Sequence, residues 1–431
     1  MSDIKIKPFT SEHKKEYNIE VPGSKSITNR ALLLAALANG KSTLKGVLFS
    51  DDSRHFLSSL ISLGFRVEID EPHKCVTIYG EGGSIPNKTS SIHVGSAGTA
   101  ARFLTAFLGI SEGNFFIDAS EQMKKRPMKE LLRSLRELGS SFTCMEKEDF
   151  LPIQIFNTSA PDATEVTIDI EKSSQFLSAL LISSCLFPSD FTVHVTGSHG
   201  MAYIDMTIAM MAQFGVLVER PDEHTFFIRH GQSYSARDYF IEPDLSAACY
   251  FYAMAPLLGI SMTVPHIPEH SLQGDLAFLD VLRQMNCTVS YDSAYDSYRV
   301  TGPENRCYPG VTADFSSFSD QTMTLAAIAP FATSPTTITG ISHIKYQECD
   351  RLHAILNELS RVGISCRELP DGIEILPGTP KPAAIETYED HRMAMAFSLL
   401  GLRTDGIVIK NAECCSKTFE TYFDVLKIMQ K

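Results

Sequence analysis

The sequence lacks several features that would assign a class of protein at once. In its 431 residues no apolar run approaches the roughly 18 residues of a membrane-spanning helix, and its ten cysteines include no Cys-x-x-Cys pair. Basic residues are outnumbered, with 38 Lys and Arg against 51 Asp and Glu and a formal net charge of −13. We therefore do not expect a membrane span, a disulfide-stapled fold or an extended basic surface for nucleic acid or anionic membranes.

Metal-binding and targeting signals are also missing. His194 and His199 have no cysteine or carboxylate cluster at ligand spacing, which argues against a zinc site. Residues 1–17 mix charged and single apolar residues and contain no signal-peptide core. We expect a cytoplasmic protein with reduced thiols, and a structural role for the adjacent Cys414 and Cys415.

Two familiar nucleotide-binding motifs are absent. A Walker loop needs a glycine at position 35, ahead of Gly40-Lys41-Ser42, but that residue is Ala35. No Gly-x-Gly-x-x-Gly follows a predicted strand, so a dinucleotide-binding fold has no support.

The sequence does contain a polar segment, Pro22-Gly23-Ser24-Lys25-Ser26, four residues before the apolar block 31–38. The Pro-Gly turn predicts a helix whose first turn holds both serines and the lysine. Backbone N–H groups, hydroxyls and an ammonium would then converge, which is the chemistry of an anion site. An exposed lysine at a helix start is the alternative, but the recurrence of the pattern favours the anion site.

A polar helix start followed by an almost uniformly apolar helix occurs six times, at intervals of roughly 70 to 77 residues. The starts are Ser24, Ser96, Ser173, Asp244, Asp320 and Asp390. Helices that are apolar on all sides are buried. Each is followed by a β-rich segment and then by a second helix that has apolar residues on one face only. The second helices end at residues that tolerate a left-handed backbone, namely Gly64, Gly139, Gly215, Asn286 and Gly363.

The sixth copy ends at its second helix, 418–429, with no strands after it. We expect the alternating segments Ile4–Lys7 and Tyr17–Val21 to supply them. This predicts an α/β protein of two domains, 23–242 and 243–431 plus 1–22, each built from three helix-strand-helix-strand units. If the three buried helices of a domain run parallel, their positive ends share one face. Six ends of roughly +0.5 charge would sum to about +3.

The polar residues that packing explains least lie near these helix starts. Small residues around Gly98 would let a ligand approach backbone N–H groups, although a tight turn would also need glycine. Ser173-Ser174-Gln175 offers three polar side chains where a helix cap needs one. Arg126 precedes Pro127 at the start of a second helix. The cations of this set are Lys25, Arg102, Arg126, Arg351, Arg392 and Lys417, which predict a receptor for two anions. Asp320 and Glu348 are available for proton transfer.

These motifs resemble those of the enolpyruvyl transferase family over nearly the whole chain. The matching segments are Pro22 to Ser26 with Asn29-Arg30, Gly98-Thr99-Ala100 with Arg102, Arg126-Pro127, Ser173-Ser174-Gln175, Glu348 with Asp350-Arg351, Asp390 to Met395, and Lys417-Thr418-Phe419. The resemblance implies a two-domain inside-out α/β barrel that closes over its substrates. It also implies transfer of the enolpyruvyl group of phosphoenolpyruvate to the 5-hydroxyl of shikimate 3-phosphate, with phosphate released from a tetrahedral intermediate.

Residue roles follow from the same resemblance. The residues expected to bind shikimate 3-phosphate are Lys25, Ser26, Arg30, Ser173, Ser174, Gln175, Tyr203, Asp320 and Gln347. Those expected to bind phosphoenolpyruvate are Lys25, Gly98, Arg126, Gln175, Arg351, Arg392 and Lys417. The expected catalytic residues are Lys25, Asp320, Glu348 and Lys417. Asp320 would take the hydroxyl proton, and Glu348 with the two lysines would handle the methylene and leaving-group protons. No metal or organic cofactor is implied.

Four positions depart from the family pattern. Gln347 replaces a usual lysine, Ser96 an asparagine and Phe103 a proline, and the segment Gly200-Met201-Ala202 lacks a serine. We hypothesise that Lys345, two residues from Gln347, compensates for the missing lysine.

Two other functions remain open at this point. The sister enzyme that acts on UDP-N-acetylglucosamine carries a cysteine in the loop that here runs from Ser120 to Lys125 without one. A non-catalytic sugar-phosphate binding protein is favoured only by Gln347. In every case we expect small-molecule partners, neither nucleic acid nor membrane, and a monomer.

Overall fold

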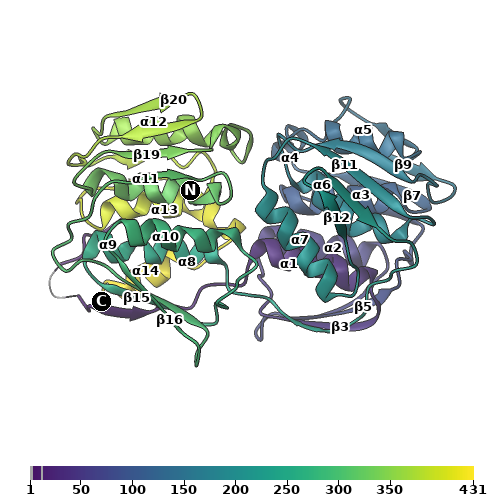
Figure 1. Ribbon diagram of the computed structural model, residues 1–431, viewed down its shortest axis with the longest axis horizontal. Coiled ribbons are helices and arrows are strands. Elements are labelled where there is room, and N and C mark those ends of the chain that lie inside the picture. The colour runs from purple at the N-terminus through teal and green to yellow at the C-terminus, as the bar shows by residue number, and fades with distance from the viewer. Residues whose placement is uncertain (1–2, 11–12) are drawn as a thin grey trace. The chain divides into compact units, whose positions relative to one another are not determined.

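The computed structural model describes residues 3–10 and 13–431, which form two compact units (Figure 1). We call Gly23–Ile241 the central unit, and Met1–Pro22 together with Glu242–Lys431 the split unit. Each is described by itself below.

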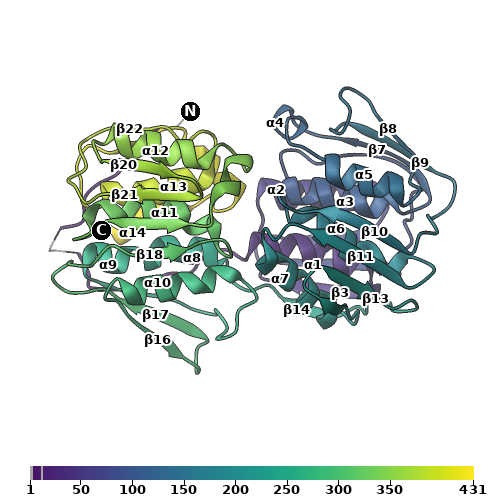
Figure 2. The ribbon, with the colours of Figure 1, turned by 45° about the horizontal axis from the view of Figure 1, so that its top comes forward.

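Three inner helices form the centre of the central unit: α1 (Lys25–Leu37), α3 (Gly98–Gly109) and α6 (Gln175–Ser183). All residues from Ile27 to Leu37 and from Gly98 to Gly109 are buried. The apolar sequences predict this burial, which also includes the polar residues Asn29, Arg30 and Arg102. Figures 1 and 2 show these helices side by side, with the strands outside them.

Each second helix of the central unit contacts two inner helices. These are α2 (Asp51–Ser62) against α1 and α3, α5 (Lys129–Glu137) against α3 and α6, and α7 (Met201–Gln213) against α6 and α1. A short helix, α4 (Glu121–Lys124), precedes α5. Because α5 begins at Lys129, Pro127 lies before the helix and not at its first position as predicted.

Three four-stranded sheets cover these helices. Their orders are β14-β3-β5-β4, β6-β7-β9-β8 and β10-β11-β13-β12, and in each the first pair is parallel and the other two pairs are antiparallel. The strands are β3 (Asn39–Lys45), β4 (Arg66–Asp70), β5 (Cys75–Glu81), β6 (Thr89–His93), β7 (Gly113–Asp118), β8 (Phe142–Cys144), β9 (Ile153–Asn157), β10 (Glu165–Asp169), β11 (Phe191–Thr196), β12 (Glu219–Asp222), β13 (Thr225–Ile228) and β14 (Asp238–Phe240).

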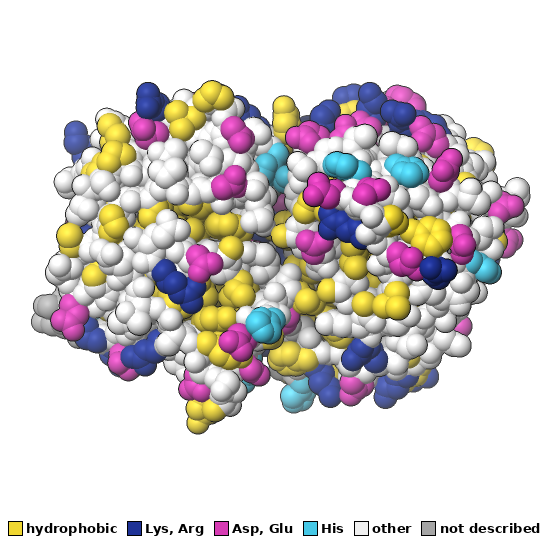
Figure 3. Space-filling model, in the orientation of Figure 1, with side chains coloured by type: hydrophobic (Ala, Val, Ile, Leu, Met, Phe, Trp, Pro, Cys, Tyr) yellow, Lys and Arg dark blue, Asp and Glu magenta, His cyan; other side chains and the backbone are white. Residues whose placement is uncertain are grey.

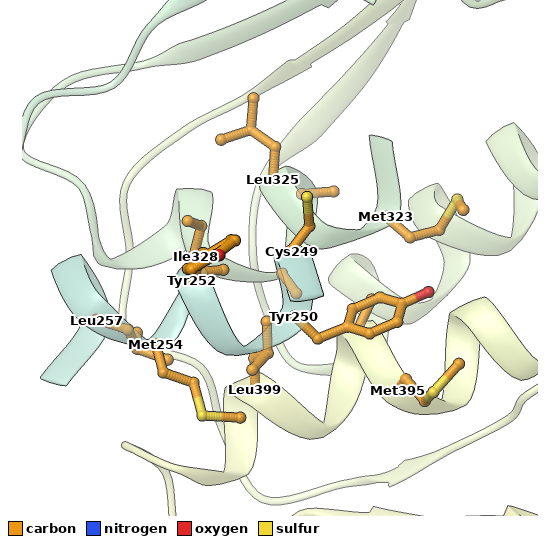
Figure 4. Close-up of a cluster of buried hydrophobic side chains, with 14 of the residues drawn as sticks. Cys249, Tyr250, Tyr252, Met254, Leu257, Met323, Leu325, Ile328, Met395 and Leu399 are labelled. Atoms are coloured by element: carbon orange, nitrogen blue, oxygen red, sulfur yellow. The ribbon is translucent and has the colours of Figure 1, made fainter. Parts of the chain in front are cut away.

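The split unit repeats this plan. Its inner helices are α8 (Leu245–Tyr252) continued by α9 (Met254–Leu258), α11 (Thr322–Ile328) and α13 (His391–Gly401), and its second helices are α10 (Phe278–Gln284), α12 (Arg351–Arg361) and α14 (Tyr422–Met429). Figure 4 shows Tyr250, Met323 and Met395, one from each inner helix, in the shared apolar core. Short 3₁₀ turns are η1 (Ser184–Leu186) in the central unit and η2 (Gly274–Ala277), η3 (Ser319–Gln321), η4 (Ala329–Phe331), η5 (Ser342–Tyr346) and η6 (Ala412–Lys417) here.

Two of the three sheets of the split unit have the same four-strand order, β2-β15-β17-β16 and β18-β19-β21-β20, and the third is β1-β23-β22. The strands are β1 (Ile4–Lys5), β2 (Glu16–Asn18), β15 (Ser261–Val264), β16 (Thr288–Asp292), β17 (Ser297–Thr301), β18 (Thr312–Asp314), β19 (Thr336–Thr339), β20 (Cys366–Leu369), β21 (Gly372–Ile375), β22 (Ala384–Ile385) and β23 (Val408–Ile409). The α/β class predicted from the sequence is confirmed.

The two N-terminal strands enter different sheets. β1 pairs antiparallel with β23 of the sixth repeat, but β2 pairs in parallel with β15 of the fourth. The prediction that both segments complete the sixth repeat is therefore wrong for the second segment. In the central unit β14, the last strand before Glu242, likewise pairs in parallel with β3 of the first repeat. Strands β2 and β14 are thus the last strands before the chain passes from one unit to the other. Each pairs with the first repeat of the unit to which it belongs.

Helix ends follow the sequence prediction closely, and helix starts less so. Gly64, Gly139, Gly215, Asn286 and Gly363 all have left-handed backbones, with φ of 91°, 94°, 99°, 63° and 79°, which confirms the predicted ends. Ser24, Asp244 and Asp390 are helix caps as predicted. The caps of α3 and α6 are Ala97 and Ser174, one residue later than predicted, and Asp320 lies in η3 ahead of α11.

Close packing of a strand end against an inner helix requires glycine at position 302. A methyl group on Gly302 would overlap the carbonyl oxygen of Ala255 in α9. We expect Gly302→Ala to lower the free energy of unfolding by about 1–3 kcal/mol, measured by urea denaturation. Gly378→Ala is the control, because its added carbon meets only the Ile364 Cδ1 atom, at 2.9 Å. Equal losses in both variants would contradict this account.

Candidate functional site

In the central unit the first two turns of the three inner helices lie at the same end of the bundle. Arg30 of α1 donates to the Ser178 hydroxyl of α6 at 3.3 Å and lies 5.4 Å from the ring centre of Phe103 in α3. Arg102 of α3 lies 5.8 Å from the ring centre of Phe176 in α6. The positive ends of these helix dipoles therefore share one region, as the sequence led us to expect.

Lys25 begins α1, and its ammonium pairs with Asp52 at the start of α2, 2.6 Å away. The Asp52 side chain is only 1% exposed, so this ion pair fixes the direction of the lysine. The cap of α1 is Ser24, whose hydroxyl accepts from the Ile27 N–H at 3.5 Å. The sequence did not point to Asp52 as a site residue, although the acidic pair Asp51-Asp52 at a helix start is a recognisable signal.

Arg30 is buried among uncharged oxygen atoms. It donates to the Thr207 hydroxyl at 2.7 Å, to the carbonyls of Ser26 and Tyr203 at 3.1 Å each, and to Ser178. Burial lowers the pKa of Arg30 to about 10. A buried guanidinium held by neutral acceptors keeps its charge available to a neighbouring anion.

Two further guanidinium groups converge on Gly98, the first residue of α3. A β-carbon on Gly98 would lie 2.6 Å from Nη1 of Arg126 and 2.7 Å from Nη1 of Arg102. Arg102 also donates to the carbonyls of Gly98 at 3.1 Å and of Pro127 at 3.2 Å. The absence of a side chain at Gly98 therefore lets both arginines approach the helix start.

The start of α6 presents three polar side chains, as predicted. The Ser173 hydroxyl accepts from the Gln175 N–H at 3.3 Å, and Ser174 is the cap residue. Within the described residues the buried Oε1 atom of Gln175 has no hydrogen-bond partner. A donor from a ligand would satisfy this acceptor.

In the split unit Arg351 connects the starts of three helices. It begins α12, is 2% exposed, and donates from Nε to Asp390 at 2.7 Å and from Nη1 to Asp320 at 2.9 Å. Burial alone would lower the pKa of Arg351, but Asp390 and Asp320 outweigh it and raise the pKa above its usual value. Gln347 accepts a further hydrogen bond from Nη1.

Asp320 bridges two arginines. Its second oxygen pairs with Nη2 of Arg392 at 2.8 Å, and Nη1 of Arg392 lies 3.5 Å from the Tyr250 hydroxyl of α8. Burial raises the pKa of Tyr250, so this phenol stays neutral. The network joins η3, which precedes α11, to the first turns of α12 and α13 and to Tyr250 in the second turn of α8.

A second acid–base pair consists of Glu348 and Lys417. The Lys417 Nζ atom lies 2.6 Å from Glu348 Oε2, and the side chains are only 10% and 12% exposed. Lys417 ends η6, and Glu348 lies two residues before Asp350, the cap of α12. The structure thus brings together two of the four predicted catalytic residues, and places Asp320 in the same unit and Lys25 in the other.

Lys345 does not reach Gln347. Its ammonium bonds to Glu368 of β20 at 2.7 Å, whereas Gln347 bonds to Arg351. The geometry therefore gives no support to the hypothesis that Lys345 replaces the missing lysine.

Asp275 and His343 lie beside this network. Neither was identified as a site residue from the sequence. Asp275 in η2 accepts from the Ser246 hydroxyl at 2.9 Å and from the Gln321 amide at 2.5 Å. Burial raises the pKa of Asp275 to about 6, and Asp320 adds to the shift. The Nε2 atom of His343 lies 2.8 Å from the Ser319 hydroxyl, and burial lowers its pKa.

Residues 3–10 and 13–431 contain no group of three or more His, Cys, Asp or Glu placed to bind a metal ion. Among these same residues, every helix is too short or too polar to span a membrane.

Comparison with known proteins decides the family. Residues 11–426 match the family described as EPSP synthase (3-phosphoshikimate 1-carboxyvinyltransferase). The chain belongs to the EPSP synthase family. It is 43% identical to the 3-phosphoshikimate 1-carboxyvinyltransferase of Trichormus variabilis over 94% of each chain, and 40% identical to that of Sulfurovum sp. over 99% of each. The EPSP synthase fold is also found in the Acinetobacter baumannii structure, with a TM-score of 0.83, 22% identity, and coverage of 99% of this chain and 98% of that one. The family predicted from the motifs is confirmed.

The buried carboxyl of Asp275 makes a pH-dependent prediction. Its pKa is raised from 3.8 to about 6 in the folded protein, so stability is greatest when it is protonated and is lost as the pH rises from about 4 through 6. Asp275→Asn removes this loss. We expect the stability of the variant relative to the parent to rise between about pH 4 and pH 6 and to level off above that, by on the order of 3 kcal/mol at most.

The measurement is urea denaturation of both proteins at several pH values. Asp280→Asn is the matched control, because that carboxylate lies nearby on α10 and is 70% exposed. A stability difference for Asp275→Asn that does not change with pH would contradict the assignment.

Proposed function

We propose that this chain acts as a 3-phosphoshikimate 1-carboxyvinyltransferase. The reaction transfers the enolpyruvyl group of phosphoenolpyruvate to the 5-hydroxyl of shikimate 3-phosphate and releases phosphate. Family membership over nearly the whole length supports this activity over the UDP-N-acetylglucosamine reaction. The single structural observation that carries the proposal is the cluster of Asp320, Arg351 and Arg392 in the same unit as the Glu348–Lys417 pair.

In this proposal the helix starts of the central unit bind shikimate 3-phosphate. Hydroxyl, amide and guanidinium groups suit a phosphorylated polyol, and the residues that supply them are Lys25, Ser26, Arg30, Ser173, Ser174, Gln175 and Tyr203. The proposal also assigns Asp320 and Gln347 to this substrate. The burial of Arg30 among neutral acceptors supports its role, because a phosphate would supply the charge that its surroundings lack.

Phosphoenolpyruvate is assigned to the groups that suit a carboxylate and a phosphate on one small molecule. These are Lys25, Gly98, Arg126, Gln175, Arg351, Arg392 and Lys417. The planar fork of arginine can bind two oxygens at once, and Asp320 and Asp390 already hold the plane of Arg351 in place. Such preorganised donors contribute roughly 2.7 to 4 kcal/mol each to transition-state stabilisation in comparable sites.

The proton transfers balance with the acids in these positions. Asp320 takes the proton of the 5-hydroxyl as the hydroxyl oxygen bonds to the central carbon of phosphoenolpyruvate. At the same time Glu348 or Lys417 protonates the methylene carbon. The resulting tetrahedral intermediate has a methyl group. Return of one methyl proton to the Glu348–Lys417 pair then restores the double bond as phosphate leaves. The Lys417 Nζ and Glu348 Oε2 atoms are in hydrogen-bond contact, at 2.6 Å.

One assay separates the three candidate functions. Phosphate release is measured with phosphoenolpyruvate plus either shikimate 3-phosphate or UDP-N-acetylglucosamine. We expect release only with shikimate 3-phosphate. Release only with the nucleotide sugar would assign the sister activity, and binding of shikimate 3-phosphate without any turnover would favour the non-catalytic binding protein.

We also propose a cytoplasmic monomer that acts only on small molecules. The net charge of −13 disfavours polyanionic partners. On the face that Figure 3 shows, Lys and Arg side chains are interspersed with Asp and Glu. Sedimentation measurements would test the oligomeric state.

Gly98→Ala tests the placement of phosphoenolpyruvate. The methyl group would lie within 2.7 Å of both Arg102 and Arg126 and would displace their guanidinium groups. We expect KM for phosphoenolpyruvate to rise about tenfold or more, and KM for shikimate 3-phosphate by less than about twofold. Gly109→Ala, at the far end of α3 against Leu135, should leave both values unchanged. Equal increases for the two substrates in Gly98→Ala would refute the assignment.

Glu348→Gln tests the proton-transfer role. Glutamine keeps the hydrogen bond to Lys417 but cannot carry a proton to or from the methylene carbon. We expect kcat to fall by roughly 10² to 10⁴, with KM values changed much less. Glu368→Gln is the control, because it alters a Lys–Glu pair of similar length, 2.7 Å, at the surface. A loss in KM alone would show that Glu348 binds substrate without transferring a proton.

A further inference from the structure

Two consecutive residues just before Asp390 have an unusual backbone. Tyr388 and Glu389 have φ of 55° and 56°, in the left-handed region that residues with a side chain rarely adopt. A strained backbone of this kind persists where the surrounding contacts hold it in place. It lies directly before the Asp390-His391-Arg392 segment of the proposed phosphoenolpyruvate set.

The contacts that hold this turn come from Glu358 on α12. Its side chain is fully buried, accepts from the Tyr388 hydroxyl at 2.7 Å, and accepts from the Glu386 N–H at 3.1 Å. Arg361 neutralises it, with Nε at 2.8 Å from Oε2. A buried carboxylate is retained at a cost in desolvation, and here each of its oxygens is bonded to the 386–388 backbone or side chains.

Helix α12 also binds Asp390, the residue that follows the turn. Arg351, at the start of α12, donates to both oxygens of Asp390, at 2.7 and 3.4 Å. Asp390 in turn accepts from the Arg392 N–H at 2.8 Å, and its own N–H donates to the Thr387 carbonyl at 2.8 Å. Release of the turn from α12 would therefore move Asp390, and with it the anchor of both Arg351 and Arg392.

We propose that Glu358 is a positioning residue for phosphoenolpyruvate binding. It does not touch the substrate, and acts by holding the left-handed turn at Tyr388–Glu389 so that Asp390 keeps both arginines in register. This inference rests on the proposed function, because Arg351 and Arg392 are assigned to phosphoenolpyruvate there.

The first test is Glu358→Gln. Glutamine has nearly the same size as glutamate but only one acceptor oxygen. It therefore cannot accept all the hydrogen bonds that Tyr388, Glu386 and Arg361 donate to Glu358. We expect KM for phosphoenolpyruvate to rise about tenfold and KM for shikimate 3-phosphate to change by less than about twofold. Tyr388→Phe removes one of the two hydrogen bonds between Glu358 and the turn, the one from the Tyr388 hydroxyl. Because the Tyr388 side chain is at the surface, the variant should fold, and we expect KM for phosphoenolpyruvate to rise about threefold. If Glu358→Gln does not fold, this milder variant still tests the proposal.

The second test is rescue by glycine. Glycine adopts positive φ without strain, so Glu389→Gly should reduce the dependence of the turn on Glu358. We expect the double variant Glu358→Gln/Glu389→Gly to return KM for phosphoenolpyruvate to within about threefold of the parent. A role for Glu358 in helix stability alone would not be rescued in this way. Glu374→Gln, which breaks a surface pair with Arg367, is the control and should leave KM unchanged.

Hydrogen exchange of the Arg392 amide gives a readout that does not depend on activity. We expect faster exchange in Glu358→Gln and slower exchange again in the double variant. If the parent does not release phosphate but exchange responds in this way, the proposed function fails and the positioning by Glu358 stands. If the parent is active and neither KM nor exchange changes in Glu358→Gln, the inference is overturned.

Discussion

A helix that is apolar on every side can present polar groups only at its ends, and this constraint organises both units. In the central unit α1, α3 and α6 bury nearly every residue, and their ammonium and guanidinium groups, Lys25, Arg30 and Arg102, all lie in the first two turns. Contacts among Arg30, Ser178 and Phe103 bring these turns together. Backbone N–H groups at the same ends add fixed positive potential. Local attraction for anions therefore arises in a chain whose net charge is −13.

The buried arginines of the two units have different partners. In the central unit Arg30 is surrounded by neutral oxygens, and its pKa falls. In the split unit Arg351 and Arg392 share Asp320, and Arg351 also binds Asp390, so its pKa rises. The first arrangement favours a ligand that brings negative charge. The second holds its cations in a fixed geometry before any ligand binds, at the cost of desolvating four charged groups.

Sequence patterns predicted those parts of the fold that depend on neighbours along the chain. The left-handed ends at Gly64 and Asn286 follow from local backbone chemistry, and the inner helices from unbroken apolar runs. Strand β2 was assigned to the wrong sheet, because two short alternating segments do not specify their partners. Asp52, Asp275 and His343 were missed for a related reason. Each is defined by a partner or by burial that tertiary structure supplies, and an aspartate at a helix start is also explained by capping.

The strand pairings also set the order in which the units can be completed during synthesis. The described strands of the central unit pair only with strands within Gly23–Ile241, so its sheets can form as soon as that stretch has left the ribosome. Strand β1 has to wait for β23, since Ile4 pairs with Ile409. At about 5–20 residues per second this delay is roughly 20–80 s. During that interval β1 remains without its sheet, while a folded unit already exists further along the same chain.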